Sequence, residues 1–424
     1  MGGILRKLIR HIIEATVVFL LIVFLPGLPP QFDFTELRVT PAMPLQGPLA
    51  LNGELNKGEH LFEGKIKGPE SLAVYKGEIY TGIHGGEIIK IVNDEIVPVV
   101  KFGKPCGGII DEAVCGRPLG LKFDTKGNLF VADAYYGIFK VDVKKRAFTQ
   151  LVSMDEPIDG KNPNFPNGID VASDGTVYWS DSSSVVDLQN GVFSMFGDHS
   201  GRLLKYNPKT KQNEVLLDSL YFSNGVCLSS KEDYVLVAET VTSRILRYHL
   251  KGPKKGQKDI FLDGLPGNPD NIKPNGNGGF FISLITQRVP GEFNVIEFIG
   301  KHTILQKFFA RMLMLVELPF STVDSIVPNT YTKKVVHWIG SFETVSDIAP
   351  SNARTLEVDE KGQVIGSLHC TDGSLKHISE VLFHDKTYYL ASPYNEYLGR
   401  VKTRIPIHIK RSDSSGLPGG VQGS

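Results

Sequence analysis

The sequence has no excess of charge of either sign and very little cysteine. Its 424 residues include 46 Lys and Arg and 46 Asp and Glu, so the formal net charge is zero. A nucleic-acid-binding protein needs a basic face, so this balance argues against a nucleic-acid partner. The four cysteines do not have the spacing of a zinc site. These absences direct attention to small molecules and membranes.

The cysteines fall into two kinds. Cys106 and Cys115 flank a short loop with two glycines, and we expect them to form a disulfide if the compartment is oxidising. Cys227 and Cys370 lie in apolar, strand-like patterns, which favours buried free thiols.

One long apolar run lies near the N-terminus, from Ile12 to Leu25. A membrane-spanning helix needs about 20 apolar residues, so this run reaches the lower limit only with its apolar neighbours included. A cleaved signal peptide is the alternative, but no small-x-small cleavage site follows, which favours an uncleaved signal-anchor. Basic residues before the run, such as Arg6 and Lys7, keep the N-terminus cytoplasmic. We therefore expect a single-pass type II membrane protein of the plasma membrane or endoplasmic reticulum, with the rest of the chain lumenal or extracellular.

Forty-four glycines and 25 prolines punctuate the remaining chain far more often than a long helical sequence allows. One pattern of loop, alternating strand, turn and second strand recurs, and its six copies begin at Gly68, Arg117, Phe165, Phe222, Asn268 and Lys376. Each copy has room for four strands in roughly 50 residues, which is the size of a propeller blade. The sequence thus predicts an all-β, six-bladed β-propeller with an N-terminal transmembrane helix.

The predicted propeller covers residues 61–405 and follows a cytoplasmic start and anchor (1–28) and a Pro-rich stalk (29–60). A polar tail, residues 406–424, is expected to be disordered. A helical insertion at about 290–325 is predicted before the last blade, because apolar residues recur there with helical spacing. These residues are Ile304, Leu305, Phe308, Phe309, Met312, Leu313 and Val316. The helix is interpreted as a lid over the channel or a second membrane contact, with packing on the propeller flank as the alternative.

The innermost strand of each propeller blade starts near the central channel, so equivalent residues face one another. Aligning the copies brings together two carboxylates and three carboxamides, contributed by Glu70, Asn167, Asn224, Asp270 and Asn271. Oxygen ligands without His or Cys suit Ca²⁺. Asn-Gly is also a common turn, which is the competing interpretation of Asn167 and Asn224. A second aligned set, formed by Asp133, Asp181 and Glu239, is interpreted as side-chain caps on turns.

Several strings, among them CGRPLG, LFVADAYYG, GRLLKY and VLVAET, resemble the strictosidine synthase-like propeller family. The wider superfamily includes the paraoxonases, which are calcium-dependent esterases and lactonases. The resemblance implies a Ca²⁺ held by the same five residues. The synthases' glutamate on the last blade is matched here by Ser379, and the paraoxonases' Pro-His-Gly is matched by Pro118-Leu119-Gly120.

The leading hypothesis is a calcium-dependent, arylesterase-like hydrolase acting on a small ester or lactone, with Asp270 as base or nucleophile. The second hypothesis is a non-catalytic binding protein with a structural Ca²⁺, which the loss of both relatives' catalytic residues favours. Amine–aldehyde condensation is a weaker third, because Ser379 cannot act as the missing acid. His84 and His377 lie in the first and last blades without an assigned role.

Overall fold

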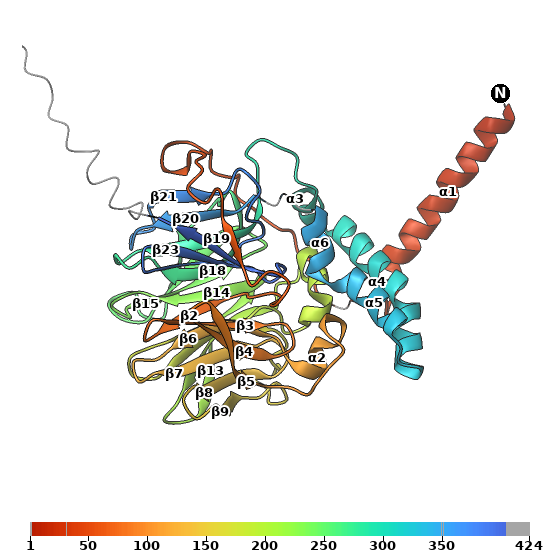
Figure 1. Cartoon of the computed structure of the whole chain (residues 1–424). Coiled ribbons are helices and arrows are strands. Elements are labelled where there is room, and N and C mark those ends of the chain that lie inside the picture. Colours follow the sequence, from red (N-terminus) through yellow and green to blue (C-terminus); the bar gives the residue numbers. More distant parts are fainter. Residues whose placement is uncertain (1, 31, 349, 351, 404–424) are drawn as a thin grey trace, which may run out of the picture.

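The chain forms a ring of six four-stranded antiparallel sheets, with helices gathered at one end (Figure 1). The computed structural model describes residues 2–30, 32–348, 350 and 352–403. The predicted tail, 406–424, lies outside the described residues. First strands of successive blades contact one another around the ring, and β22 contacts β2 to close it. The predicted six-bladed propeller is therefore confirmed.

Five blades are built from four strands that follow one another along the chain, apart from the insertion inside the fifth. The first two contain β2 (Leu72–Tyr75), β3 (Glu78–Ile83), β4 (Glu87–Val92), β5 (Glu95–Lys101), β6 (Pro118–Phe123), β7 (Asn128–Asp133), β8 (Gly137–Asp142) and β9 (Ala147–Val152). The next two contain β10 (Pro166–Val171), β11 (Val177–Asp181), β12 (Gly201–Asn207), β13 (Gln212–Leu220), β14 (Ser223–Leu228), β15 (Tyr234–Glu239), β16 (Arg244–His249) and β17 (Lys258–Leu262). Blade five contains β18 (Gly267–Pro274), β19 (Phe280–Gln287), β20 (Arg354–Val358) and β21 (Val364–His369).

The sixth blade joins the two ends of the propeller. Its strands β22 (Glu380–His384), β23 (Thr387–Ala391) and β24 (Leu398–Lys402) are completed by β1 (Glu59–Leu61). In this pairing Glu59 lies opposite Arg400, and the two side chains form an ion pair at 2.6 Å. An N-terminal strand thus closes the ring and removes the free edge that β24 would expose.

The hydrophobic core lies between neighbouring blades. Leu236 and Ile245 of blade four pack with Ile272 and Ile282 of blade five, and all four side chains are buried. Alternating apolar residues on the strands supply these layers, because successive side chains point to opposite faces of a sheet. Residues 29–60 also contribute to the core. Leu37, Leu49 and Leu55 are buried, so this segment runs along the propeller instead of forming the expected stalk.

Helices and short helical turns form the end of the molecule from which α1 projects (Figure 1). They comprise α1 (Gly2–Phe24), η2 (Ile109–Asp111), α2 (Glu112–Cys115), η3 (Leu188–Phe196), α3 (Val295–Gly300), α4 (Thr303–Ile326), α5 (Thr330–Gly340) and α6 (Phe342–Ile348). A further short turn, η1 (Gly47–Leu49), lies against β21 of blade five. Within the described part of the chain, no helix combines the length and the apolar character that crossing a membrane requires. The predicted transmembrane helix is present as α1, but its membrane-spanning assignment is not confirmed.

The helical insertion precedes the last blade, as predicted, and is longer than expected. It extends from α3 to α6, residues 295–348, whereas the sequence predicted about 290–325. It connects β19 to β20 and therefore lies inside blade five. The spacing between first-strand motifs does not show which strand precedes an insertion, so its place within the blade was not predicted.

Candidate functional site at the mouth of the channel

The five residues predicted to hold a cation, called the ring residues below, lie where the innermost strands begin. Glu70 comes just before β2, Asn167 lies in β10, Asn224 in β14, and Asp270 and Asn271 in β18. All five side chains are buried. Glu70, Asn167, Asn224 and Asp270 line one cavity, whereas Asn271 is not among its lining residues. The structure thus brings four of the five predicted residues to a common space.

A shared backbone irregularity aims these side chains inward. The pairing of β10 with β11 shifts register between Pro166 and Ile169, and β6, β14 and β18 shift at the equivalent place. Such a bulge bends a strand and redirects its side chains. Asn167 and Asn224 lie at these shifts, within strands. The interpretation of their Asn-Gly pairs as simple turns is therefore wrong.

The glycines after these asparagines are needed for close packing between blades. A Cβ on Gly168 would lie 2.5 Å from the carbonyl oxygen of Asn224, and one on Gly225 would lie 2.5 Å from that of Asp270. No larger residue fits at either position without moving the backbone. Each glycine thus holds its own blade against the site residue of the next.

Three oxygen atoms of the ring have no hydrogen-bond partner among the described residues. They are Glu70 Oε2, Asn167 Oδ1 and Asn224 Oδ1, and all three are buried. The amide of Asn167 donates instead to Ser182 Oγ at 3.1 Å, which leaves its oxygen free. Buried polar atoms are almost always paired, so an unpaired set calls for a missing partner. Carboxylate and carboxamide oxygens together fit a hard divalent cation such as Ca²⁺.

The two carboxylates at the channel mouth also call for a bound cation. Burial raises the pKa of Glu70 to about 7, and repulsion from Glu380 adds to the shift. Burial and the nearby Glu70 carboxylate raise the pKa of Asp270 well above its ordinary value. Two buried carboxylates of like charge are costly without a cation between them. Asn271 serves this pair indirectly, because its Nδ2 donates to Glu70 Oε1 at 2.7 Å and orients the carboxylate.

No group of three or more His, Cys, Asp and Glu side chains in the described ranges has an arrangement that could hold a metal ion. The ring has only two such side chains, and its other oxygens come from asparagines. A cation here would therefore depend on the carboxamides as much as on the carboxylates.

The cavity has a volume of about 950 Å³ and lies between the propeller and the helices. Ring residues line one part of it, and Phe165 and Phe222 add an apolar wall. His337 of α5 and Phe342 of α6 line it from the insertion. A cavity of this size holds a small organic molecule, with polar groups at one place and apolar surface around it.

The seven residues predicted for a lid or membrane helix have mixed surroundings. Leu305, Phe309 and Leu313 pack near η3, and of the seven only Leu313 lines the cavity. Phe308 contacts Phe19 of α1 with ring centroids 4.7 Å apart. The remaining members, Ile304, Met312 and Val316, are half-buried or exposed. The cover over the cavity is thus formed mainly by α5, α6 and the segment before α3, which the sequence did not single out.

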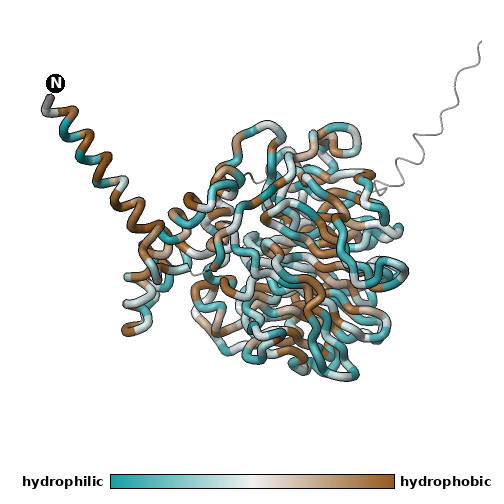
Figure 2. The backbone as a smooth tube through the Cα atoms, turned by 180° about the vertical axis from the view of Figure 1, so that it is seen from behind, coloured by the Kyte–Doolittle hydropathy of each residue, from teal (hydrophilic) through white to brown (hydrophobic). Residues whose placement is uncertain are grey.

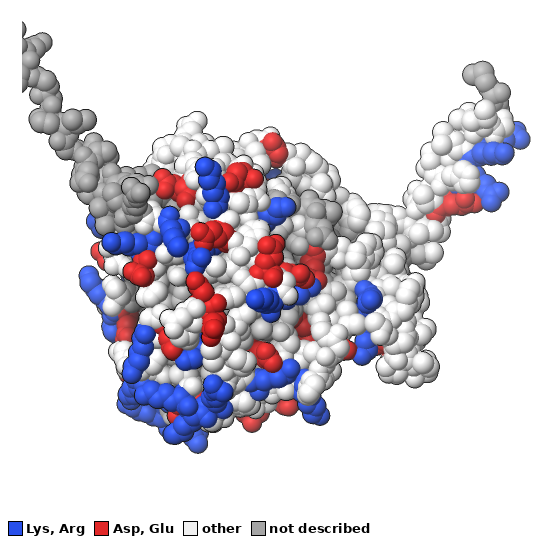
Figure 3. Space-filling model, viewed as in Figure 1, with Lys and Arg blue, Asp and Glu red and all other residues white. Residues whose placement is uncertain are grey.

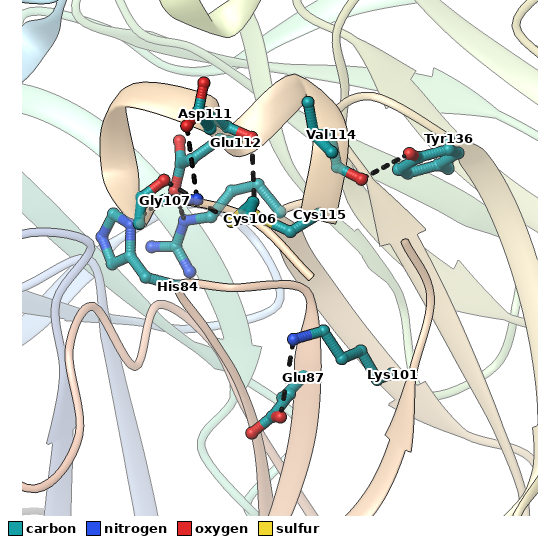
Figure 4. The surroundings of a disulfide bond; sticks show 12 residues. His84, Glu87, Lys101, Cys106, Gly107, Asp111, Glu112, Val114, Cys115 and Tyr136 are labelled. Atoms are coloured by element: carbon teal, nitrogen blue, oxygen red, sulfur yellow. Dashed lines mark hydrogen bonds and ion pairs between the residues drawn. A yellow bond between two sulfur atoms is a disulfide. The ribbon is translucent and has the colours of Figure 1, made fainter. Parts of the chain in front are cut away.

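A second polar group lines the cavity and was not predicted as a unit. His84, Glu112 and Arg117 all belong to it. The confirmed disulfide between Cys106 and Cys115 lies beside this group, and Figure 4 shows His84 and Glu112 pointing toward one another. Arg117 stands two residues before the ring position of blade two, which is the signal that could have identified it.

Asp133, Asp181 and Glu239 all bind backbone amides, and Asp133 caps its own turn as predicted. Asp181 and Glu239 instead accept from amides 16–18 residues earlier and pair with Arg202 and Arg244. Asp133 Oδ1 accepts from the amides of Tyr135 and Tyr136, both at 3.0 Å. Asp181 Oδ1 accepts from two backbone amides, and Glu239 Oε1 from one. Cys227 and Cys370 are buried free thiols, which confirms that prediction too.

Blades two and six have Leu119 and Ser379 at the position equivalent to the ring residues, and neither is a metal ligand here. Leu119 presents an apolar, buried side chain to the cavity. Ser379 is buried, and its Oγ donates to the backbone oxygen of Glu70 at 2.6 Å. Neither position supplies an acid or a base.

Comparison with known proteins identifies relatives over most of the chain. Residues 167–253 match the model of strictosidine synthase, and residues 47–91 match the strictosidine synthase-like N-terminal model. The adipocyte plasma membrane-associated protein Hemomucin of Drosophila melanogaster is 44% identical over 95% of this chain and 70% of its own length. The human adipocyte plasma membrane-associated protein is 38% identical over 84% of this chain and 80% of its own length.

A gluconolactonase from Xanthomonas campestris has a similar fold. Its structure matches with a TM-score of 0.51 and 13% identity, over 88% of this chain and 98% of the gluconolactonase.

Proposed function

Because this chain belongs to the strictosidine synthase-like family of adipocyte plasma membrane-associated proteins, we propose that it is a membrane-associated, calcium-dependent hydrolase of esters or lactones. One observation carries the proposal: three unpaired, buried oxygens belong to side chains that line a cavity large enough for a small substrate.

Glu70, Asn167, Asn224 and Asp270 would hold the cation, and Asn271 would orient Glu70. A bound Ca²⁺ supplies Lewis-acid polarisation of the acyl oxygen and neutralises the two carboxylates. The ring residues themselves provide the fixed oxygens at which a hard cation is bound.

Asp270 is our candidate for the base or nucleophile. Its carboxylate lines the cavity, and a hydrogen bond from the side chain of Asn224 stabilises its ionised form. In the base role, an Asp270 oxygen takes a proton from the attacking water. Phe165 and Phe222 surround the substrate with apolar surface and exclude bulk water. The helices α5 and α6 cover the same space.

Amine–aldehyde condensation of the strictosidine synthase type needs a glutamate at one position of the last blade, where this chain has none. The matching side chain is Ser379, whose hydroxyl is occupied by the Glu70 carbonyl. A non-catalytic binding protein with a structural Ca²⁺ is the second candidate function. The apolar Leu119 in the place of a catalytic histidine favours it.

Membrane association rests on the relatives' names and on exposed apolar side chains. Ile326 and Trp338 are 74% and 66% exposed, on helices α4 and α5. Hydrophobic residues predominate along α1, which projects from the propeller (Figure 2). We propose that α1 anchors the chain as a single-pass type II membrane protein and that α4 and α5 lie on the bilayer surface. The propeller is then lumenal or extracellular, where the disulfide is stable.

Hydrolysis of phenyl acetate and a small panel of lactones tests the enzymatic proposal. We expect turnover by the wild-type chain with Ca²⁺, no turnover with a chelator, and a loss of at least a hundredfold in Asn224→Ala. Asn268→Ala is the matched control, because Asn268 also lines the cavity but its side chain bonds to Thr240 and Thr286. If no substrate reacts although Ca²⁺ raises the melting temperature, the non-catalytic function is correct.

A further inference from the structure

The polar group beside the ring is built from three separate segments. His84 follows β3, Glu112 starts α2, and Arg117 precedes β6. The Glu112 carboxylate lies between the other two: its Oε1 contacts His84 Nδ1 and lies 3.6 Å from Arg117 Nε. His84 Nε2 in turn lies 3.0 Å from the carbonyl oxygen of Pro393. All three side chains line the cavity.

The turn that carries Glu112 is fixed at both ends. Cys115, the last residue of α2, is cross-linked to Cys106 (Figure 4). Asp111, the residue before Glu112, pairs with Lys333 of α5 at 2.6 Å. Glu112 therefore keeps its position between His84 and Arg117, and the guanidinium of Arg117 is held in one place.

Arg117 has more donors than acceptors. Its side chain is 2% exposed, and a guanidinium carries five N–H groups. With the part of the chain that the structure describes, its side chain makes one hydrogen bond, from Nη2 to the carbonyl oxygen of Pro393 at 3.4 Å. Within the described residues, buried Nη1 has no acceptor. A buried, charged donor without a partner is costly, so a ligand that supplies an acceptor is favoured.

Arg288 shows the contrast within the same cavity. It also lines the space and is buried, but the protein satisfies it. Its Nε pairs with Glu297 at 2.6 Å, Nη1 donates to the Leu265 carbonyl at 2.8 Å, and Nη2 donates to that of Thr40 at 2.9 Å. An unpaired Nη1 is thus a particular property of Arg117.

We propose that Arg117 binds the carboxylate of the cavity's ligand, and that this ligand is an acid with an apolar body. Two carboxylate oxygens match the planar fork of a guanidinium. The apolar body would lie on the wall that Leu119, Phe165 and Phe222 form.

Binding of a carboxylate by Arg117 does not require hydrolysis. The identification of this carboxylate as a reaction product rests on the proposed function. Hydrolysis adds water across the acyl carbon–oxygen bond and yields a carboxylate, an alcohol and a proton. The carboxylate product carries the group that Arg117 lacks. The substrates are then esters or lactones of apolar acids, and Arg117 holds the acid after cleavage.

Binding of benzoate and of its neutral analogue benzamide to the full chain, measured by calorimetry with Ca²⁺ present, tests the inference. We expect benzoate to bind at least tenfold more tightly than benzamide. Arg117→Gln should abolish this preference. Lys301→Gln should keep it, since it removes one positive charge from an exposed residue of the same cavity. Asn268→Ala should also keep it, because the side chain of Asn268 lines the cavity but bonds to Thr240 and Thr286.

A preference that persists in Arg117→Gln, or one that Asn268→Ala abolishes, overturns the proposal. If Arg117→Gln does not fold, a crystal structure of the wild-type chain with 4-bromobenzoate decides the matter. The carboxylate must lie within hydrogen-bond distance of Arg117 Nη1, and any other position refutes the inference. Benzoate is not hydrolysed, so this result is independent of turnover. The chain can bind carboxylates at Arg117 without hydrolysing any ester, and it can hydrolyse esters without binding carboxylates at Arg117.

Discussion

At the scale of single residues, the site depends on how each asparagine uses its amide nitrogen and its amide oxygen. Asn167 donates from Nδ2 to Ser182 and leaves its oxygen unpaired, whereas Asn271 directs Nδ2 at Glu70. The same residue type thus supplies a free oxygen in one blade and positions a carboxylate in another. Aligned repeats predict which residues meet at the channel. They cannot predict this division of roles, because it depends on which neighbour accepts the amide hydrogens.

The buried carboxylates predict how pH controls the effect of Ca²⁺. The pKa of Glu70 is raised to about 7, so between its ordinary value of 4.5 and about 7 the folded chain binds more protons than the unfolded chain. The contribution of Glu70 to the stability of the metal-free protein then falls as the pH rises through this window. Ca²⁺ binds the ionised carboxylates and should raise the melting temperature strongly at pH 8 and little at pH 5.

Scanning calorimetry with Ca²⁺ or chelator at several pH values makes this comparison. Asn224→Ala keeps both carboxylates, so it should keep the pH dependence of the metal-free protein while losing the stabilisation by Ca²⁺. Equal stabilisation by Ca²⁺ at pH 5 and pH 8 would contradict the assignment of these carboxylates to a cation site.

At the scale of elements, α4 connects the propeller end to α1 through a buried polar face. Arg311 of α4 is buried, and its Nη1 donates to the carbonyl oxygens of Ile22, Val23 and Leu25, at 3.1, 2.9 and 3.0 Å. These carbonyls belong to the C-terminal end of α1, where a cation is favoured by the helix dipole. The apolar spacing of α4 predicted the helix but not this contact, since the carbonyls lie far away in sequence.

Replacement of Arg311 should therefore loosen α1. In Arg311→Ala we expect amide hydrogen exchange in the last turn of α1 to rise roughly 10- to 100-fold, because the carbonyls there lose a charged partner worth about 1.5–3 kcal/mol. Hydrogen exchange read by mass spectrometry measures the effect. Lys307→Ala, one turn earlier in α4, is the control and should exchange like the wild type. Unchanged exchange in Arg311→Ala would show that the contact does not hold α1.

At the scale of the whole molecule, the surface is divided by polarity. Charged side chains cover the blades, and the face of α4 and α5 seen in Figure 3 has few of them. Trp338 of α5 is exposed, whereas Trp179, the other tryptophan of the chain, is completely buried. Amphipathic helices with exposed aromatic residues favour the membrane interface.

Trp338 reports directly on membrane contact. Addition of phosphatidylcholine–phosphatidylserine vesicles to the full chain should shift tryptophan emission to the blue, because Trp338 leaves water. Trp338→Phe should bind vesicles without the shift, and Ile260→Ser, an exposed apolar residue of β17 away from the helices, should behave like the wild type. Binding to vesicles with no change in wild-type emission would mean that α1 alone contacts the bilayer.

Much of this architecture could be predicted from repeated turns and alternating strands, since each blade is a local unit. The closure of blade six was missed, because the three residues of β1 have no detectable periodicity and pair with β24 across the whole propeller. The burial of Leu37, Leu49 and Leu55 was missed for a similar reason: single leucines in a Pro-rich segment give no pattern. Arg117 and Glu112 were missed because an ion pair between loops depends on the folded ring.

Calorimetric titration of Ca²⁺ into chelator-treated protein at pH 8 tests the cation site most directly. We predict one site per chain in the wild type, an affinity at least a hundredfold weaker in Asn224→Ala, and wild-type affinity in Asn268→Ala. An absence of Ca²⁺ binding by the wild-type chain, or equal affinity in Asn224→Ala, would contradict a cation held by the oxygens at the channel mouth.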